Sequence, residues 1–162
     1  MFRPMRRHGQ QLPEVECRAI LERGSSGVLA VLGDEDYPYA VPLSYVCCGD
    51  TLYFHCAKAG HKLDAVRRHD KASFCVIDQD QVVPAEYTTY FRSVIAFGRV
   101  REVTEAEEFR RAICLLADKY APREGNTRRD GAIEKEMPAL CMLALEIEHL
   151  TGKEAIELKR SR

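Results

Sequence analysis

Histidine, cysteine and lysine side chains capable of chemistry are concentrated in one short part of the chain. Residues 39–64 read YAVPLSYVCCGDTLYFHCAKAGHKLD. His55 could donate a proton, contact a substrate or bind a metal, because imidazole titrates near neutral pH. His61 and Lys62 stand where a helical pattern begins, and a helix N-terminus attracts anions through its free N–H groups. Each also has an ordinary explanation: a structural strand histidine, and a solvated helix start.

The spacing of the cysteines and histidines argues against a zinc site and against a nucleophilic cysteine. The candidate ligands in this segment are Cys47, Cys48, His55, Cys56 and His61. Adjacent cysteines lack the C-x₂-C spacing of structural zinc sites, and no second pair follows at a matching interval. With five histidines and seven cysteines in the chain, a Cys–His pair arises easily by chance. We therefore expect no metal and mostly structural thiols.

The composition is that of one soluble domain. The chain has 162 residues, and 46% of them are hydrophobic, which is enough for a core of its own. A net charge of -1 gives no reason to expect nucleic-acid binding. An odd number of cysteines without regular spacing indicates a reducing compartment. Because we find neither a secretory signal nor an apolar run long enough for a bilayer, we expect a cytoplasmic protein that does not enter a membrane.

The hydrophobic pattern predicts a domain built mainly from hairpins. Helices are expected at 13–24, 60–68, 105–120 and 132–137, and strands at 27–32, 39–47, 51–56, 72–78, 91–103 and 139–147. Within the single domain 1–162, residues 1–12 would form an arm and residues 151–162 a charged tail. Gly98 indicates a bulge or bend. The absence of regular βαβ alternation favours a small antiparallel barrel with peripheral helices over a doubly wound sheet.

The predicted strand at 51–56 alternates its side chains between two faces. Tyr53 and His55 would share one face, while Cys56 would lie on the other with two apolar residues. The sequence contains neither a G-x-G-x-x-G motif nor a P-loop, so a phosphate would have to bind without those glycine-rich loops. The candidate phosphate site is therefore the helix start at His61 and Lys62.

Three segments in a characteristic order resemble a known family. They are VPLSYV (41–46), YFHCAKAGHKLD (53–64) and FRSVIAFGRV (91–100). With these segments the chain resembles the pyridoxamine 5'-phosphate oxidase-like flavoproteins, and among them the nitroimidazole-resistance (Nim) related proteins most. The resemblance implies a mainly β fold, a six-stranded antiparallel Greek-key FMN-binding split barrel with peripheral helices. It also implies a homodimer with FMN at the subunit interface.

The resemblance implies roles for nine residues, which are Val41, Pro42, Leu43, Ser44, His55, Cys56, His61, Lys62 and Ser93. Residues 41–44 would border the isoalloxazine ring, largely through backbone groups, and Ser93 would reach the cofactor. His55 and Cys56 match positions that contact the flavin or line its pocket. His61 and Lys62 match an Arg-Lys pair that binds the FMN phosphate in the oxidases. His55 also matches an active-site histidine of the Nim proteins, which makes it the expected catalytic residue.

Two departures from the oxidases limit what the resemblance implies. His61 replaces their arginine, a permanently charged and bidentate phosphate partner, so FMN binding is expected to be weaker or pH-dependent. Their C-terminal substrate-binding segment has no counterpart here, so vitamin B6 oxidation is not expected.

The function that the resemblance implies is that of an FMN-dependent, nitroreductase-like oxidoreductase. It would pass electrons from a small-molecule donor to a small acceptor such as a nitroaromatic or a quinone. One alternative is a non-catalytic module that binds or senses flavin, haem or deazaflavin on the same barrel. Another is an empty barrel that serves only as an interaction domain.

Overall fold

Alternating apolar residues assemble seven strands into one antiparallel sheet in the computed structural model, which describes residues 2–160. The strands are β1 (Ser26–Leu32), β2 (Pro38–Ser44), β3 (Val46–Cys48), β4 (Thr51–Ala57), β5 (Lys71–Val83), β6 (Thr88–Glu102) and β7 (Leu140–Glu154). Their order in the sheet is β2-β1-β5-β6-β7-β4-β3. Because β2 also contacts β4, the sheet curls around a core that contains Leu29, Phe54 and Phe74. The predicted mainly β, antiparallel split barrel is confirmed.

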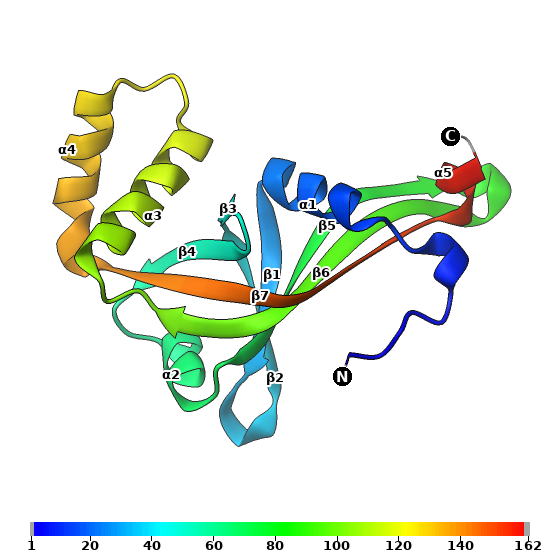
Figure 1. The fold of residues 1–162 in the computed structure, drawn as a ribbon, viewed down its shortest axis with the longest axis horizontal. Coiled ribbons are helices and arrows are strands. Elements are labelled where there is room, and N and C mark those ends of the chain that lie inside the picture. The colour runs from blue at the N-terminus through cyan, green and yellow to red at the C-terminus, as the bar shows by residue number, and fades with distance from the viewer. Residues whose placement is uncertain (1, 161–162) are drawn as a thin grey trace.

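The helices lie around this sheet (Figure 1). They are α1 (Glu14–Arg23), α2 (His61–Arg68), α3 (Ala106–Tyr120), α4 (Asn126–Glu136) and α5 (Ile156–Arg160), with short 3₁₀ turns at His8–Gln10, Asp34–Asp36, Pro84–Glu86 and Met137–Ala139. The apolar stripe of α3 covers the outward side of β4 and β7, and α4 lies beside α3. Within residues 2–160, every helix is too short or too polar to cross a membrane.

The predicted strand at 39–47 is interrupted at Tyr45, which explains why the sheet has seven strands rather than six. Tyr45 is fully buried, and its hydroxyl donates a hydrogen bond to the Leu21 carbonyl at 2.6 Å. Its N–H donates to the Tyr120 hydroxyl at 2.9 Å, and its carbonyl accepts from Lys119 at 3.0 Å. Side chains of α3 thus replace a neighbouring strand as partners of this backbone, and the run divides into β2 and β3.

Three strands extend beyond the apolar pattern that predicted them. β5 and β6 form a long hairpin, and β7 continues to Glu154, so residues 151–154 pair with β6 instead of starting a tail. In this polar extension Arg92 lies 3.3 Å from the Asp78 carboxylate and 3.4 Å from that of Glu154. These ion pairs link three strands and stabilise the extension. Because the residues are charged, the apolar pattern of the sequence did not predict it. Residues 1, 161 and 162, part of the predicted arm and tail, lie outside the described residues.

The helix before β7 is longer than predicted. α4 covers Asn126–Glu136, whereas the sequence pattern indicated a loop to residue 131 and a helix only from 132. Its one buried residue is Ile133, so the apolar period is too sparse to indicate the first turn. That turn is held by Arg129, which lies 2.8 Å from Asp118 of α3.

Gly98 marks a bulge, as the sequence predicts. The register between β6 and β7 shifts between Phe97 and Gly98. A Cβ atom at Gly98 would collide with the backbone carbonyl oxygen of Glu146 on β7. The position therefore requires glycine for close approach of two backbones.

The variant Gly98→Ala is expected to lower the free energy of unfolding by about 3 kcal/mol, because a backbone clash cannot be relieved by rotating a side chain. Urea unfolding followed by circular dichroism measures the change. Gly131→Ala is the matched control, since a Cβ there meets no atom within 4 Å. It lies within α4, so alanine should raise stability by about 0.5–1 kcal/mol. Equal effects of the two variants would disprove the packing argument.

Candidate functional site at the end of strand β4

β4 is buried on both faces, and this determines where the predicted site residues point. Phe54 and Cys56 face inward and join the barrel core. Tyr53 faces outward and packs beneath α3, where its hydroxyl donates a hydrogen bond to Glu108 at 2.9 Å. His55 alternates onto the outward face as well, but its side chain is exposed. The predicted separation of His55 and Cys56 onto opposite faces is confirmed.

A small cavity of about 220 Å³ lies between β2, the end of β4 and the start of α2. It is lined by Tyr39, Val41, Cys56, Ala57, Ala59, Gly60, His61, Lys62 and Leu63. We call it the α2 cavity. Four of the nine predicted cofactor residues meet there, namely Val41, Cys56, His61 and Lys62.

The first turn of α2 begins without a capping side chain among the described residues. Gly60 precedes the helix with a φ of 132°, in the region that favours glycine. Its carbonyl accepts hydrogen bonds from the N–H groups of Leu63 at 3.0 Å and Asp64 at 3.1 Å. The N–H groups of His61 and Lys62 come before these and find no side-chain acceptor. Such free N–H groups, together with the helix dipole, favour an anion.

The two basic candidates at this helix start differ in their contacts. Lys62 is half-buried and forms no hydrogen bond or ion pair within residues 2–160. The His61 ring stacks on Tyr39 at 4.1 Å between centroids, and its Nε2 lies 3.3 Å from the Asp34 backbone nitrogen. The Asp34 carboxylate is 3.6 Å from the same Nε2. An anion in the α2 cavity therefore meets Lys62 as an unpaired cation, whereas His61 is already held by its neighbours.

A second and larger cavity of about 650 Å³ lies between α3, α4 and the outward side of β4. Its lining consists of Ser44, His55, Ile113, Leu116, Ala117, Tyr120, Ala121, Glu124, Arg128, Arg129, Ala132, Ile133, Glu136 and Leu140. We call it the α3–α4 cavity. Ser44 and His55, two of the predicted site residues, line this cavity and not the α2 cavity.

Sequence reasoning missed the helical walls of the α3–α4 cavity. The periodic apolar residues of α3 predict a core-facing stripe, and Ile113 and Leu116 are indeed buried. The stripe continues to Tyr120, whose side chain is 43% exposed. The apolar stripe of α3 is thus longer than the part of the sheet that it covers. This excess length is the sequence signal that could have indicated a second apolar cavity.

The remaining predicted residues lie apart from both cavities. Leu43 packs against the barrel core. Pro42 pairs with Val28 on β1, on the outer face of the sheet. Ser93 is half-buried on β6, where it pairs with Ile77 of β5 and Lys153 of β7. It is not among the residues that line the α2 cavity of its own chain.

The outer face of β2, β1, β5 and β6 carries no charged side chain along two successive rows of paired residues. The rows are Pro42–Val28–Cys75–Ile95 and Ala40–Ala30–Ser73–Phe97. Val28 is 37% exposed, and Ile77 on the same face of β5 is 64% exposed. A contiguous apolar surface of this kind is typical of a protein–protein interface.

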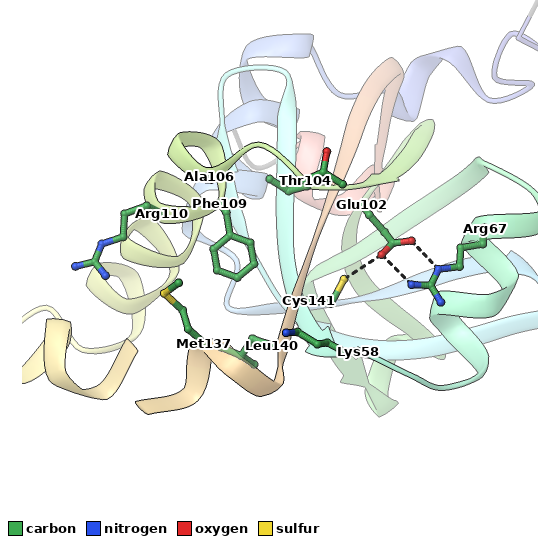
Figure 2. Close-up of a pocket in the computed structure, with 11 residues that line it drawn as sticks. Lys58, Arg67, Glu102, Thr104, Ala106, Phe109, Arg110, Met137, Leu140 and Cys141 are labelled. Atoms are coloured by element: carbon green, nitrogen blue, oxygen red, sulfur yellow. Dashed lines mark hydrogen bonds and ion pairs between the residues drawn. The ribbon is translucent and has the colours of Figure 1, made fainter. Parts of the chain in front are cut away.

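A third cavity of about 590 Å³ lies at the N-terminal end of α3, with Lys58 in its lining (Figure 2). Glu102 accepts two hydrogen bonds from Arg67, at 2.6 and 3.0 Å, and the Cys141 thiol lies 3.7 Å from the same carboxylate. Burial and the neighbouring Cys56 raise the pKa of Cys141 to about 12, while Arg67 lowers the pKa of Glu102. At neutral pH the thiol is protonated and the carboxylate is charged. Neither group is suited to act as a nucleophile or a proton donor.

Two other cysteines, Cys17 and Cys56, are poorly suited to act as nucleophiles, because both are buried. All seven are free thiols, and Cys17 and Cys56 are buried. Burial raises the pKa of both thiols, and for Cys17 the value is about 11. Residues 2–160 contain no group of three or more His, Cys, Asp or Glu side chains placed to hold a metal ion.

Comparison with known proteins identifies the family. The family model of pyridoxamine 5'-phosphate oxidase matches residues 13–154. The chain therefore belongs to the pyridoxamine 5'-phosphate oxidase family, as the sequence segments predicted. A protein of Rhizobium meliloti (strain 1021) without an assigned function is 31% identical over 88 residues, which is 54% of this chain. The match spans about half of that protein, 53% of its length.

Solved structures share the fold. A conserved hypothetical protein of Mycobacterium tuberculosis has a TM-score of 0.80 at 16% identity, over 93% of this chain and 90% of its own. A protein of Bacteroides thetaiotaomicron assigned to 5-nitroimidazole antibiotic resistance has a TM-score of 0.73 at 18% identity, over 88% and 85%. An FAD and haem binding protein of Mycobacterium smegmatis has a TM-score of 0.74 at 22% identity, over 90% and 73%. At these identities the likenesses establish the fold of the chain.

Proposed function

We propose that this chain is a homodimeric flavoprotein that binds FMN and passes electrons from a small-molecule donor to a small acceptor, such as a nitroaromatic or a quinone. The observation that carries the proposal is the α2 cavity. There an unpaired lysine and an uncapped helix N-terminus lie beside the edge of β2, in a member of the pyridoxamine 5'-phosphate oxidase family. FMN would supply the redox chemistry, while the protein binds and orients it and excludes water.

The α2 cavity fits the phosphate end of FMN. Lys62 would form a charge-assisted hydrogen bond with the phosphate, next to the free N–H groups of the first turn. At about 220 Å³ the cavity is smaller than the roughly 300–1,000 Å³ of pockets that enclose a whole ligand. The isoalloxazine ring would therefore extend out of it along residues 41–44. β2 is an edge strand, so its backbone groups on that side are available to hold the ring.

A second copy of the chain would complete this site. Ser93 matches a family position that reaches the cofactor, yet it does not line the α2 cavity of its own chain. It lies on the same outer face as Val28 and Pro42, next to the two uncharged rows, and these rows are suited to pairing two copies. In such a dimer the Ser93 hydroxyl of one chain would approach the ring held by the other.

His55 would act on the acceptor. Reduction of a nitro group or a quinone consumes protons as well as electrons, and imidazole is a suitable donor at neutral pH. The His55 side chain is exposed and forms no hydrogen bond within the described part of the chain, so it is free to contact a bound molecule. It therefore remains our candidate for the catalytic residue.

A non-catalytic carrier or sensor is the second candidate. The structural relatives include a flavocytochrome of Azotobacter vinelandii and the FAD and haem binding protein of Mycobacterium smegmatis. The same barrel in this chain would then hold flavin, haem or deazaflavin without turnover. The apolar cavity beside His55 makes haem worth testing, since histidine is a common axial ligand.

Protein purified without added cofactor is expected to be yellow, to show flavin absorption and to release fluorescent FMN on heating. When reconstituted, it should oxidise NAD(P)H in the presence of a nitroaromatic or a quinone. The absorption spectrum and a turnover assay check both statements. A Soret band without flavin would disprove the FMN proposal. Bound flavin that supports no turnover with any such acceptor would favour the carrier.

The variant Lys62→Ala is expected to weaken FMN binding by about 10- to 100-fold, the value of one charge-assisted hydrogen bond. Fluorescence titration of cofactor-free protein measures the Kd, and FMN should raise the melting temperature of the wild type more than that of the variant. Lys58→Ala is the matched control, because that lysine lines the third cavity. His61→Ala should weaken binding less, since His61 is held by Tyr39 and Asp34. Equal losses for Lys58→Ala and Lys62→Ala would rule out the α2 cavity as the phosphate site.

The variant Val28→Glu is expected to dissociate the dimer, because it places a charge in the middle of an uncharged face. Light scattering during gel filtration should show the mass fall from twice to once the chain mass of 18.4 kDa. Val15→Glu is the control, since Val15 on α1 is 75% exposed and lies away from this face. A wild-type monomer, or a Val28→Glu dimer, would show that this face does not pair two copies.

A further inference from the structure

We propose that the α3–α4 cavity binds the electron acceptor and selects an uncharged, planar, apolar molecule, such as a quinone or a nitroaromatic without an ionised substituent. This inference rests on the proposed function and deepens it. It assigns the acceptor to a cavity built by two helices outside the barrel and gives that cavity a chemical preference.

The size and lining of the cavity suit such a molecule. Its volume of about 650 Å³ lies within the roughly 300–1,000 Å³ of small-molecule pockets. The inner wall is apolar, and its members are Ile113, Leu116, Ala117, Ala132, Ile133 and Leu140. Ser44 and His55 are the polar residues that β2 and β4 contribute to the lining. A few polar groups at one side of an apolar cavity are the usual arrangement for orienting a small ligand.

The charged groups of the lining do not favour an anion. Arg128 donates to Glu124 at 2.6 Å. Arg129 lies 2.8 Å from Asp118 and 3.0 Å from an oxygen of Asp130. Both guanidinium groups are thus already paired, and the carboxylate of Glu136 is a further negative charge in the lining. Because carboxylates already balance the charge of both guanidinium groups, the lining offers an anionic acceptor little net attraction.

Hydrogen bonds to the barrel hold the C-terminal end of α3, and they turn an aromatic ring toward the cavity. The Tyr120 hydroxyl accepts the Tyr45 N–H at 2.9 Å and is bonded to the Ser25 carbonyl. Lys119 donates to the carbonyls of Gly24 at 2.6 Å and Tyr45 at 3.0 Å. Because the Tyr120 hydroxyl is occupied, its ring is the part that can contact a ligand. An immobilised ring is a good surface for a flat, apolar molecule.

The position of the cavity links it to the flavin. Ser44 is the last residue of the 41–44 segment that would border the isoalloxazine ring, and it also lines the α3–α4 cavity. His55 lines the cavity from the neighbouring strand end. An acceptor in the cavity would therefore lie between the apolar helices and the ring, with His55 at hand as the proton donor.

The test measures binding of menadione, a neutral quinone, to the full chain with FMN bound and after FMN removal, by isothermal titration calorimetry. The variant Ala132→Trp fills the cavity from α4, and we expect it to weaken menadione binding by about 10-fold or more while the Kd for FMN is unchanged. Ala117→Phe fills it from α3 and should have the same effect. Ala106→Trp is the matched control, because Ala106 lines the third cavity. For the wild type, naphthoquinone-2-sulfonate should bind about 10-fold or more weakly than menadione.

The outcomes separate this inference from the proposed function. If both filling variants bind menadione like the wild type, or the sulfonate binds as well as menadione, the assignment of the cavity is wrong even when FMN binds. If FMN does not bind but menadione does, and both variants abolish that binding, the cavity assignment stands and the proposed function fails. Unchanged circular dichroism of the variants shows that lost binding is not lost folding.

Discussion

Burial of β4 on both faces is the constraint on which the candidate site depends. The strand pairs with β7 on one side and β3 on the other, its inward side chains fill the barrel, and Tyr53 on its outward face lies under α3. Because side chains alternate along a strand, adjacent residues at its end must enter different environments. Cys56 therefore reaches the α2 cavity and His55 the α3–α4 cavity. A shift of one residue in the pairing of β4 with β7 would exchange the positions of the His55 and Cys56 side chains and bring the imidazole into the core.

Local patterns were sufficient to predict the hairpin architecture, the two faces of β4 and the bulge at Gly98. They failed where distant side chains determine the backbone. The break at Tyr45 depends on Lys119 and Tyr120, which approach only after α3 has packed. The extension of β7 to Glu154 depends on Arg92. Neither contact can be recognised from the sequence pattern. Each joins single residues on two distant segments, and a single residue does not produce a repeating pattern.

For the candidate site, the sequence indicates the position of the basic residues but not the contacts that they form. The helix start at residues 61 and 62 stands out because a glycine precedes two basic residues, and the family resemblance assigned it to phosphate. The sequence does not reveal that the two side chains have different partners. Tyr39 and Asp34 reach His61 from β2 and the turn before it, so the residue that replaces the oxidase arginine is turned toward its own chain. Lys62, in contrast, has no hydrogen-bond or ion-pair partner within the described residues.

The structure separates the residues proposed for the cofactor from those proposed for the acceptor into two packing units. Val46, Tyr53, Ala112, Ile113 and Met142 belong to an apolar cluster beneath α3 that is distinct from the barrel core. Substitutions along the α3–α4 cavity would therefore disturb that outer cluster while the α2 cavity keeps its supports in the barrel. Mutations more than about 7–10 Å apart that share no partners usually act independently. Substitutions in α3 and α4 would thus change the preference for the acceptor without loss of the cofactor. His55 must keep its position in such variants, because it lies between the proposed cofactor and acceptor sites.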